Sequence, residues 1–141
     1  MIQEVYLIDN EDDIKNKLEV MFENESDYKF KKANTNEIDT VLRNIPALII
    51  INEDNIEDDI TKICNNIRTN EDNSITPIIV ISSNRDKSHR IEILKVCVEH
   101  YIIAPIDEEY LYYTIKNVIR LLYINRRVSP LTGLPGNVQI Q

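Results

Sequence analysis

The sequence predicts an α/β protein in which five strand–helix units, a (βα)₅ series, form one doubly wound parallel sheet. Short apolar runs alternate along the chain with longer stretches of 3.6-residue periodicity. Several of the short runs are continuous and rich in β-branched residues, as expected for strands covered on both faces. With 141 residues, of which 43% are hydrophobic, the chain suits a single domain with a buried core. Because βαβ crossovers are right-handed, we expect the strand order 2-1-3-4-5.

The five expected strands are the short apolar runs. Pro46, Pro77 and Pro105 punctuate the boundaries of the last three, which are the continuous ones. In chain order, the strands are expected over residues 5–8, 28–33, 47–51, 78–81 and 101–103.

The five expected helices lie between and after these strands, where apolar residues recur every three or four positions. Thr35 is placed to cap the second helix, and the acidic run 107–109 favours the start of the fifth. The fifth helix is expected over about residues 107–127. The first four are marked by Ile14, Leu18, Met21 and Phe22; by Ile38, Val41, Leu42 and Ile45; by Ile56, Ile60, Ile63, Cys64 and Ile67; and by Ile91, Leu94 and Val98.

Composition excludes several function classes. The only two glycines, Gly133 and Gly136, lie near the end of the chain, so residues 1–132 contain neither a P-loop nor a G-x-G-x-x-G dinucleotide turn. The net charge of −8 repels phosphate groups, so we expect no nucleic acid and no anionic membrane as partners.

The cysteines, histidines and N-terminus indicate a cytoplasmic protein. Cys64 and Cys97 lie in apolar-periodic stretches, so we expect both to be buried free thiols in a reducing compartment. His89 and His100 lack the spacing of a zinc site. The chain has neither a signal-peptide pattern at its start nor a run of 18 apolar residues.

Polar residues directly after the strands are the candidate site. In open α/β sheets the functional crevice lies beyond the carboxyl ends of the strands. The residues delivered there are Asp9, Asn10 and Glu11; Asn52, Glu53 and Asp54; Ser82 and Ser83; and Ala104 before Pro105.

Four segments, in order and at the appropriate spacing, resemble the receiver domain of two-component response regulators. They are VYLIDNEDDI, PALIIINEDN, TPIIVISS and HYIIAPIDEEYL, and the resemblance covers roughly residues 2–125. It implies the flavodoxin-like receiver fold. In that family two acids after the first strand and an aspartate ending the third strand hold Mg²⁺, and this aspartate accepts the phosphoryl group. A Ser or Thr ending the fourth strand and a Lys before the proline contact that group.

Matched position by position, the resemblance implies a degenerate receiver. Asp9 keeps the first acid, but Asn10 stands in place of the second. The phosphoacceptor position is Asn52, whose amide is neutral and poorly nucleophilic. Ser82 keeps the hydroxyl, whereas Ala104 replaces the lysine. We therefore expect a pseudo-receiver without catalytic residues.

Some alternatives stay open at this site. Tyr101 matches the family's switch aromatic, although packing explains a half-buried strand tyrosine equally well. Glu53 or Asp54 is the alternative phosphoryl acceptor, and Asp9, Glu11 and Asp54 are the alternative ligands of a loosely held divalent cation. We favour a solvated acidic rim, with no metal or cofactor; Mg²⁺ belongs to the alternative.

The last expected helix carries more apolar surface than one buried face needs. Leu111, Ile115, Val118 and Leu122 suit the side that packs on the sheet. The remaining surface predicts a dimer or partner face, with hydrated tyrosines as the alternative. Its expected residues are Tyr110, Tyr112, Tyr113, Ile119 and Tyr123, together with Ile124.

After Arg127 the composition changes to VSPLTGLPGNVQIQ. Its SPLTGLPGN segment resembles the opening of GGDEF (diguanylate cyclase) domains, with Ser129 where Asp is usual; a bare linker is the alternative. We expect a receiver-like domain with an extended last helix over residues 1–127, and a linker with the truncated start of a GGDEF domain over residues 128–141.

Together these features predict a non-enzymatic regulatory domain of a two-component-type protein. It would control an attached diguanylate cyclase, which makes cyclic di-GMP, through homodimerisation or through a histidine kinase or another signalling partner. The alternatives are a phosphate-accepting receiver that uses Mg²⁺ and a non-standard acid, and a stand-alone interaction adaptor.

Overall fold

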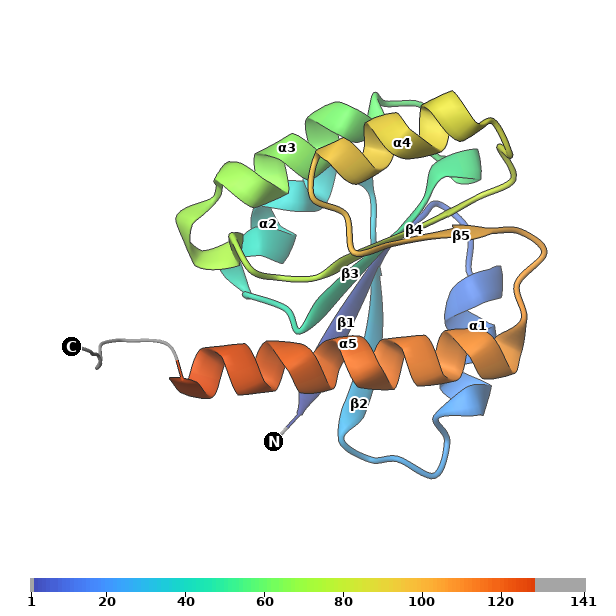
Figure 1. Cartoon of the computed structure of the whole chain (residues 1–141). Coiled ribbons are helices and arrows are strands. Elements are labelled where there is room, and N and C mark those ends of the chain that lie inside the picture. The colour runs from blue at the N-terminus through green and yellow to red at the C-terminus, as the bar shows by residue number, and fades with distance from the viewer. Residues whose placement is uncertain (1, 129–141) are drawn as a thin grey trace.

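The protein folds as a parallel sheet between two layers of helices, in a computed structural model that describes residues 2–128 (Figure 1). The strand order is β2-β1-β3-β4-β5, and each neighbouring pair is parallel, which confirms the predicted topology. The strands are β1 (Gln3–Ile8), β2 (Tyr28–Ala33), β3 (Leu48–Asn52), β4 (Ile78–Ser82) and β5 (His100–Ile103).

The helices divide between the two faces of the sheet. Figure 1 shows α1 and α5 on one side and α2, α3 and α4 on the other. Their bounds are α1 (Asp13–Met21), α2 (Ile38–Arg43), α3 (Ile60–Thr69), α4 (Lys87–Lys95) and α5 (Glu108–Val128). The five-unit alternation is therefore confirmed.

The central strands are apolar throughout because both of their faces are buried. In β3, Leu48 and Ile50 face the core under α1 and α5, whereas Ile49 and Ile51 face the core under α2, α3 and α4. All four are at most 1% exposed. Since successive strand side chains point to opposite faces, a continuous apolar run fills both cores at once. Burial of each such side chain contributes about 1.5–3 kcal/mol relative to exposure.

The start of α2 differs from the prediction. A 3₁₀ turn (Thr35–Glu37) precedes the helix, and the N–H of Asn34 donates to Glu37 Oε1 at 2.8 Å. Asn34 therefore caps the 3₁₀ turn, and Glu37, rather than Thr35, occupies the N-cap position of α2. Thr35 instead donates its hydroxyl to Asp58. The predicted cap of α2 was wrong because a 3₁₀ turn with its own cap lies between Asn34 and the helix.

The two cysteines also differ from each other. Cys64 is buried, and burial raises its pKa to about 12. The prediction that Cys97 is buried was wrong, because α4 ends at Lys95 and Cys97 is exposed in the turn that leads to β5. The φ of Cys97 is 66°, a left-handed value that is incompatible with a continuing helix. The helix therefore ends at Lys95, about one turn before Val98, the last residue of the apolar pattern.

Two further predictions concern the end of the chain and the membrane. The linker and GGDEF-like opening fall on residues 129–141, which lie outside the described residues. Within residues 2–128, the structure contains no helix with the length and apolar character needed to cross a membrane.

Candidate functional site

A buried carboxylate lies at the centre of the carboxyl edge of the sheet. Asp9, at the end of β1, is 2% exposed. Its Oδ1 accepts hydrogen bonds from the N–H of Glu11 at 3.1 Å and from Asn55 Nδ2 at 2.9 Å. Its Oδ2 accepts from Asn52 Nδ2 at 3.1 Å. Three neutral donors therefore satisfy the buried negative charge, as a buried carboxylate requires.

This arrangement does not fit a bound Mg²⁺. The cation needs oxygen ligands, but Asn52 and Asn55 both direct amide N–H donors at the Asp9 carboxylate. Asn10 is exposed, and Asp54 is engaged with Ser83 instead. Across residues 2–128, no cluster of three or more His, Cys, Asp or Glu side chains is placed to hold a metal ion.

Ser82 and Ala104, the two other positions matched to the receiver pattern, lie at the carboxyl ends of β4 and β5. Ser82, at the end of β4, is 1% exposed, and its Oγ accepts from the N–H of Asn84 at 3.1 Å. The N–H of Ala104 donates to the Ser82 carbonyl at 2.9 Å. In the sheet register Asn52 pairs with Ile81, directly before Ser82. The predicted set therefore meets at one edge, but Ala104 brings a methyl group where a cation would stabilise a phosphoryl group.

Asp54 makes a contact that the sequence did not indicate. Its Oδ1 accepts from the N–H of Ser83 at 3.1 Å and from Ser83 Oγ at 3.0 Å, and its Oδ2 accepts from the same N–H at 3.1 Å. Asp54 follows β3 and Ser83 follows β4, so the contact joins two adjacent loops. Only the parallel order of these strands, not spacing along the chain, brings the two residues together.

A second cluster joins the 3₁₀ turn after β3 (Glu53–Asn55) to α4 and β5. His89 Nε2 lies 2.7 Å from Glu53 Oε2, while Glu53 Oε1 is buried with no hydrogen-bond partner among the described residues. The His89 ring meets the Tyr101 ring edge-on at 6.2 Å between centroids. The Tyr101 hydroxyl donates to the Asn84 carbonyl at 2.8 Å, and burial raises the pKa of this phenol. The Glu53–His89 pair had no signal in the sequence, because the two residues lie on separate units.

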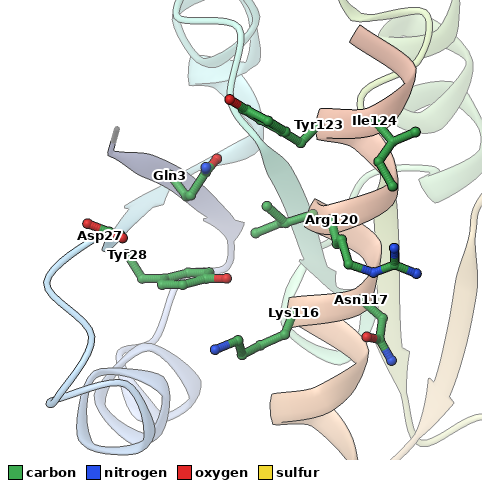
Figure 2. Close-up of a pocket in the computed structure, with 9 residues that line it drawn as sticks. Gln3, Asp27, Tyr28, Lys116, Asn117, Arg120, Tyr123 and Ile124 are labelled. Carbon is green, nitrogen blue, oxygen red and sulfur yellow. The ribbon is translucent and has the colours of Figure 1, made fainter. Parts of the chain in front are cut away.

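A cavity lies at each end of the parallel strands. A polar hollow of about 250 Å³ adjoins Asp9, between the loops after β1, β2 and β3. A groove of about 670 Å³ lies instead along α5, beside the starts of β1 and β2 (Figure 2). In Figure 2 the Tyr28 ring points toward α5, whereas the Arg120 side chain points away from that ring. The groove's polar groups therefore do not converge on one point, as they do in a built ligand site.

The predicted partner face on α5 is only partly exposed. Tyr110 and Tyr113 are each 57% exposed, and Tyr123 is 44% exposed. Ile119 is only 4% exposed, and Tyr112 packs against Phe22 with 4.8 Å between ring centroids. Assigning those two residues to the partner face was therefore wrong, because their helical positions point them at the sheet and at α1.

The structure adds one exposed residue, Leu121, to this face, and Ile124, which the sequence also indicated there, is exposed. Leu121 is 52% exposed and Ile124 is 37% exposed. Ile124 lies on the side of α5 away from the core positions Val118 and Leu122, whereas Leu121 lies beside Val118 at the edge of the packed side.

Comparisons with known proteins support the fold. No family model matches the chain, and no curated protein matches it. Among solved structures, it is similar to a signal receiver domain of a histidine kinase from Clostridium thermocellum, with 23% identity, a TM-score of 0.73 and coverage of 85% of this chain and 99% of that chain. A two-component response regulator from Clostridium difficile matches with 23% identity, a TM-score of 0.73 and coverage of 85% and 98%.

A third similar structure contains a metal. It is the receiver domain of the sensor histidine kinase PA1611 from Pseudomonas aeruginosa, with a magnesium ion coordinated in its active-site cleft. The identity is 18%, the TM-score is 0.71, and the match covers 85% of this chain and 99% of that chain. At these identities the matches confirm the receiver fold that the resemblance implied.

Proposed function

We propose that this chain is a regulatory receiver-like module of a signalling protein that works without phosphorylation at position 52. The observation that carries the proposal is the hydrogen bond from Asn52 Nδ2 to the buried Asp9. In the acceptor position the chain holds an uncharged amide that donates a hydrogen bond to the neighbouring carboxylate. The chain itself is then not an enzyme, and its role is to present a surface.

The chemistry of phosphoryl transfer supports this proposal. An aspartyl nucleophile must be anionic, and the Asn52 amide carries no charge. Transfer also needs cations aimed at the developing negative charge, but Ala104 offers none and the donors around Asp9 leave no ligand set for Mg²⁺. The nucleophile and both sources of positive charge are therefore missing together.

Acetyl phosphate tests the proposal. The chain is incubated with acetyl phosphate and Mg²⁺ and its intact mass is measured. We expect no added phosphoryl group on the wild type and a labile gain on the N52D/A104K double variant, which returns the nucleophile and the cation. A labile gain on the wild type contradicts the proposal, and its location on Glu53 or Asp54 supports the phosphate-accepting alternative.

The exposed side of α5 suggests a second copy of the chain as the partner. Tyr110, Asn117 and Ile124 follow one another at seven-residue spacing, and Leu121 lies four residues after Asn117. All four are exposed. Asn117, Leu121 and Ile124 follow the four- and three-residue spacing that is typical of a coiled-coil seam, and Thr114, which would continue the spacing toward Tyr110, is 9% exposed. We therefore favour a homodimer over a histidine kinase as the partner of this face.

The segment after α5 suggests the output. The helix runs to Val128, and SPLTGLPGN follows it directly. If a diguanylate cyclase domain follows in cis, a dimer of this module holds two cyclase domains at high effective concentration, as a reaction between two GTP molecules requires. The coding sequence beyond Gln141 tests this part: a downstream GGDEF or GGEEF turn supports it, and its absence favours the interaction adaptor.

A further inference from the structure

We propose that the Asp54 carboxylate is a built-in anion that holds the loop between β4 and α4 in one arrangement, without any transferred group. The inference rests on the proposed function, in which no phosphoryl group is transferred to this edge of the sheet. It adds a residue and a contact to that function: the charge is supplied permanently by the turn after β3.

The geometry of the contact suits this role. Asp54 lies in the 3₁₀ turn Glu53–Asn55 that follows β3, and Ser83 is the first residue after β4. Both carboxylate oxygens lie 3.1 Å from the Ser83 nitrogen, and Oδ1 also accepts from Ser83 Oγ at 3.0 Å. Hydrogen bonds to an ionised acceptor are stronger than neutral ones. One carboxylate therefore holds both the backbone and the side chain of Ser83.

The residues after Ser83 carry the restraint on to β5. The N–H of Asn84 donates to Ser82 Oγ at 3.1 Å, and the carbonyl of Asn84 accepts from the Tyr101 hydroxyl at 2.8 Å. Both backbone groups of Asn84 are thus bound, directly beside the residue that Asp54 holds. Tyr101 is the residue matched to the switch aromatic, so the orientation of its hydroxyl depends on the loop that Asp54 fixes.

The other acids of residues 53–59 do not duplicate this contact. Glu53 pairs with His89 on α4, Asp58 accepts from Thr35, and Asp59 caps α3 by accepting from Thr61. Glu57 is exposed and makes no hydrogen bond or ion pair within the described chain. We call the Asp54–Ser83 contact the clamp, and it depends on position 54 alone. Substitution of Glu57 provides the control, because it removes the same charge from the same loop.

Amide hydrogen exchange of the full chain tests the clamp. In D54A we expect the amides of Ser83 and Asn84 to exchange about tenfold faster than in the wild type, as loss of a charge-assisted contact predicts. In E57Q they should be unchanged. The amide of Val80 in β4 should keep its protection in both variants, which shows that the fold is intact. Unchanged exchange of Ser83 in D54A would overturn the proposal.

A double-mutant cycle tests whether Asp54 and Tyr101 act through one loop. Y101F removes the hydroxyl that binds the Asn84 carbonyl. We expect this substitution to raise the exchange rate of the Asn84 amide when Asp54 is present, and to raise it by less than half that factor in the D54A background. Equal effects in both backgrounds would contradict the coupling. Phosphoryl uptake by the wild type together with a loosened D54A loop overturns the proposed function alone. No uptake together with an unchanged D54A loop overturns the clamp alone.

Discussion

Within residues 2–128, two residues other than glycine adopt left-handed backbone angles. Ile45, between α2 and β3, has a φ of 47°, and Cys97, between α4 and β5, has a φ of 66°. The chain has no glycine before Gly133, so these turns are made by residues with a Cβ atom. A left-handed residue other than glycine costs about 1–2 kcal/mol. Because no glycine is available at these turns, the folded protein carries backbone strain at Ile45 and Cys97.

Relieving that strain at Cys97 should stabilise the protein. Glycine removes the Cβ clash at φ 66° but makes the unfolded chain more flexible, and the difference leaves a net gain of about 0.5–1 kcal/mol in C97G. The free energy of unfolding from urea titration measures this gain. C97A is the matched control, since it removes the exposed thiol and keeps the Cβ. A gain of the same size in C97A would mean that the thiol, not the backbone angle, is responsible.

The Asn52–Asp9 hydrogen bond predicts how an acidic residue at position 52 behaves. N52D places a second carboxylate against a carboxylate that is 2% exposed, so we expect a loss of about 1–3 kcal/mol in unfolding free energy at pH 7. Added Mg²⁺ should recover part of the loss in N52D, because a cation screens the pair. N52S, which adds no charge, should show no response to Mg²⁺. Equal Mg²⁺ responses of the two variants would contradict this account.

At the scale of elements, the loop before β2 is fastened to α5. Glu25 accepts hydrogen bonds from Lys116 Nζ at 2.6 Å and from the Tyr112 hydroxyl. The bonds from Lys116 and then Tyr112 lower the pKa of Glu25, and the bond to Glu25 raises the pKa of Lys116. The Lys116 ammonium also lies 5.8 Å from the centre of the Tyr28 ring. This contact fixes the loop against the middle of α5.

The pKa directions set the pH range in which this contact stabilises the fold. Because the folded pKa of Glu25 is lowered, its contribution is present above the unfolded value of 4.5 and is lost as the pH falls through the folded pKa. E25Q should therefore be less stable than the wild type at pH 7, by at most about 1 kcal/mol because the pair is partly exposed to solvent. The difference should vanish at a pH below the folded pKa of Glu25. Urea titrations at both pH values measure it. Glu23, an exposed acid of the same loop, gives the control E23Q; a similar loss in E23Q would contradict the assignment.

The elements of this fold were predictable because one pattern determines each of them. A strand buried on both faces, such as β3 or β4, needs an unbroken apolar run, and few other structures use one. The cap of α2 and the end of α4 depend on local turns, and both were misplaced. Helical position explains the errors on α5: all its tyrosines look alike in sequence, but Tyr112 turns toward α1.

The candidate site was predictable only in part. The strand ends identified Asp9, Asn52 and Ser82, because parallel strands deliver their last residues to one edge. Which side chains then bind each other depends on loop geometry that the sequence does not encode locally. The Asn55–Asp9 bond and the Asp54–Ser83 contact are examples, since each joins separate units of the chain.

At the scale of the whole molecule, charge opposes self-association and the exposed side of α5 favours it. The net charge is −8, so two copies repel each other at low ionic strength. The proposed seam is mainly apolar and includes no acid. Screening the repulsion should therefore tighten a dimer rather than dissolve it. Light scattering at low and at moderate salt measures this: a dimer that weakens as salt is added would indicate an interface built on ion pairs instead.

The seam itself is tested by placing a charge in it. L121R puts a guanidinium in the middle of the proposed interface, and losing a buried leucine alone costs enough to weaken the dimer at least about tenfold. The matched control is V20R on α1, where the native side chain is 66% exposed and lies outside the seam. Sedimentation of each variant over a range of concentrations gives the dissociation constants. This face would be ruled out by a wild type that stays monomeric at the highest concentration, or by a V20R variant whose dimer is as weak as that of L121R. A dimer weakened in L121R alone would place the contact on α5, where it can control a domain that follows the helix.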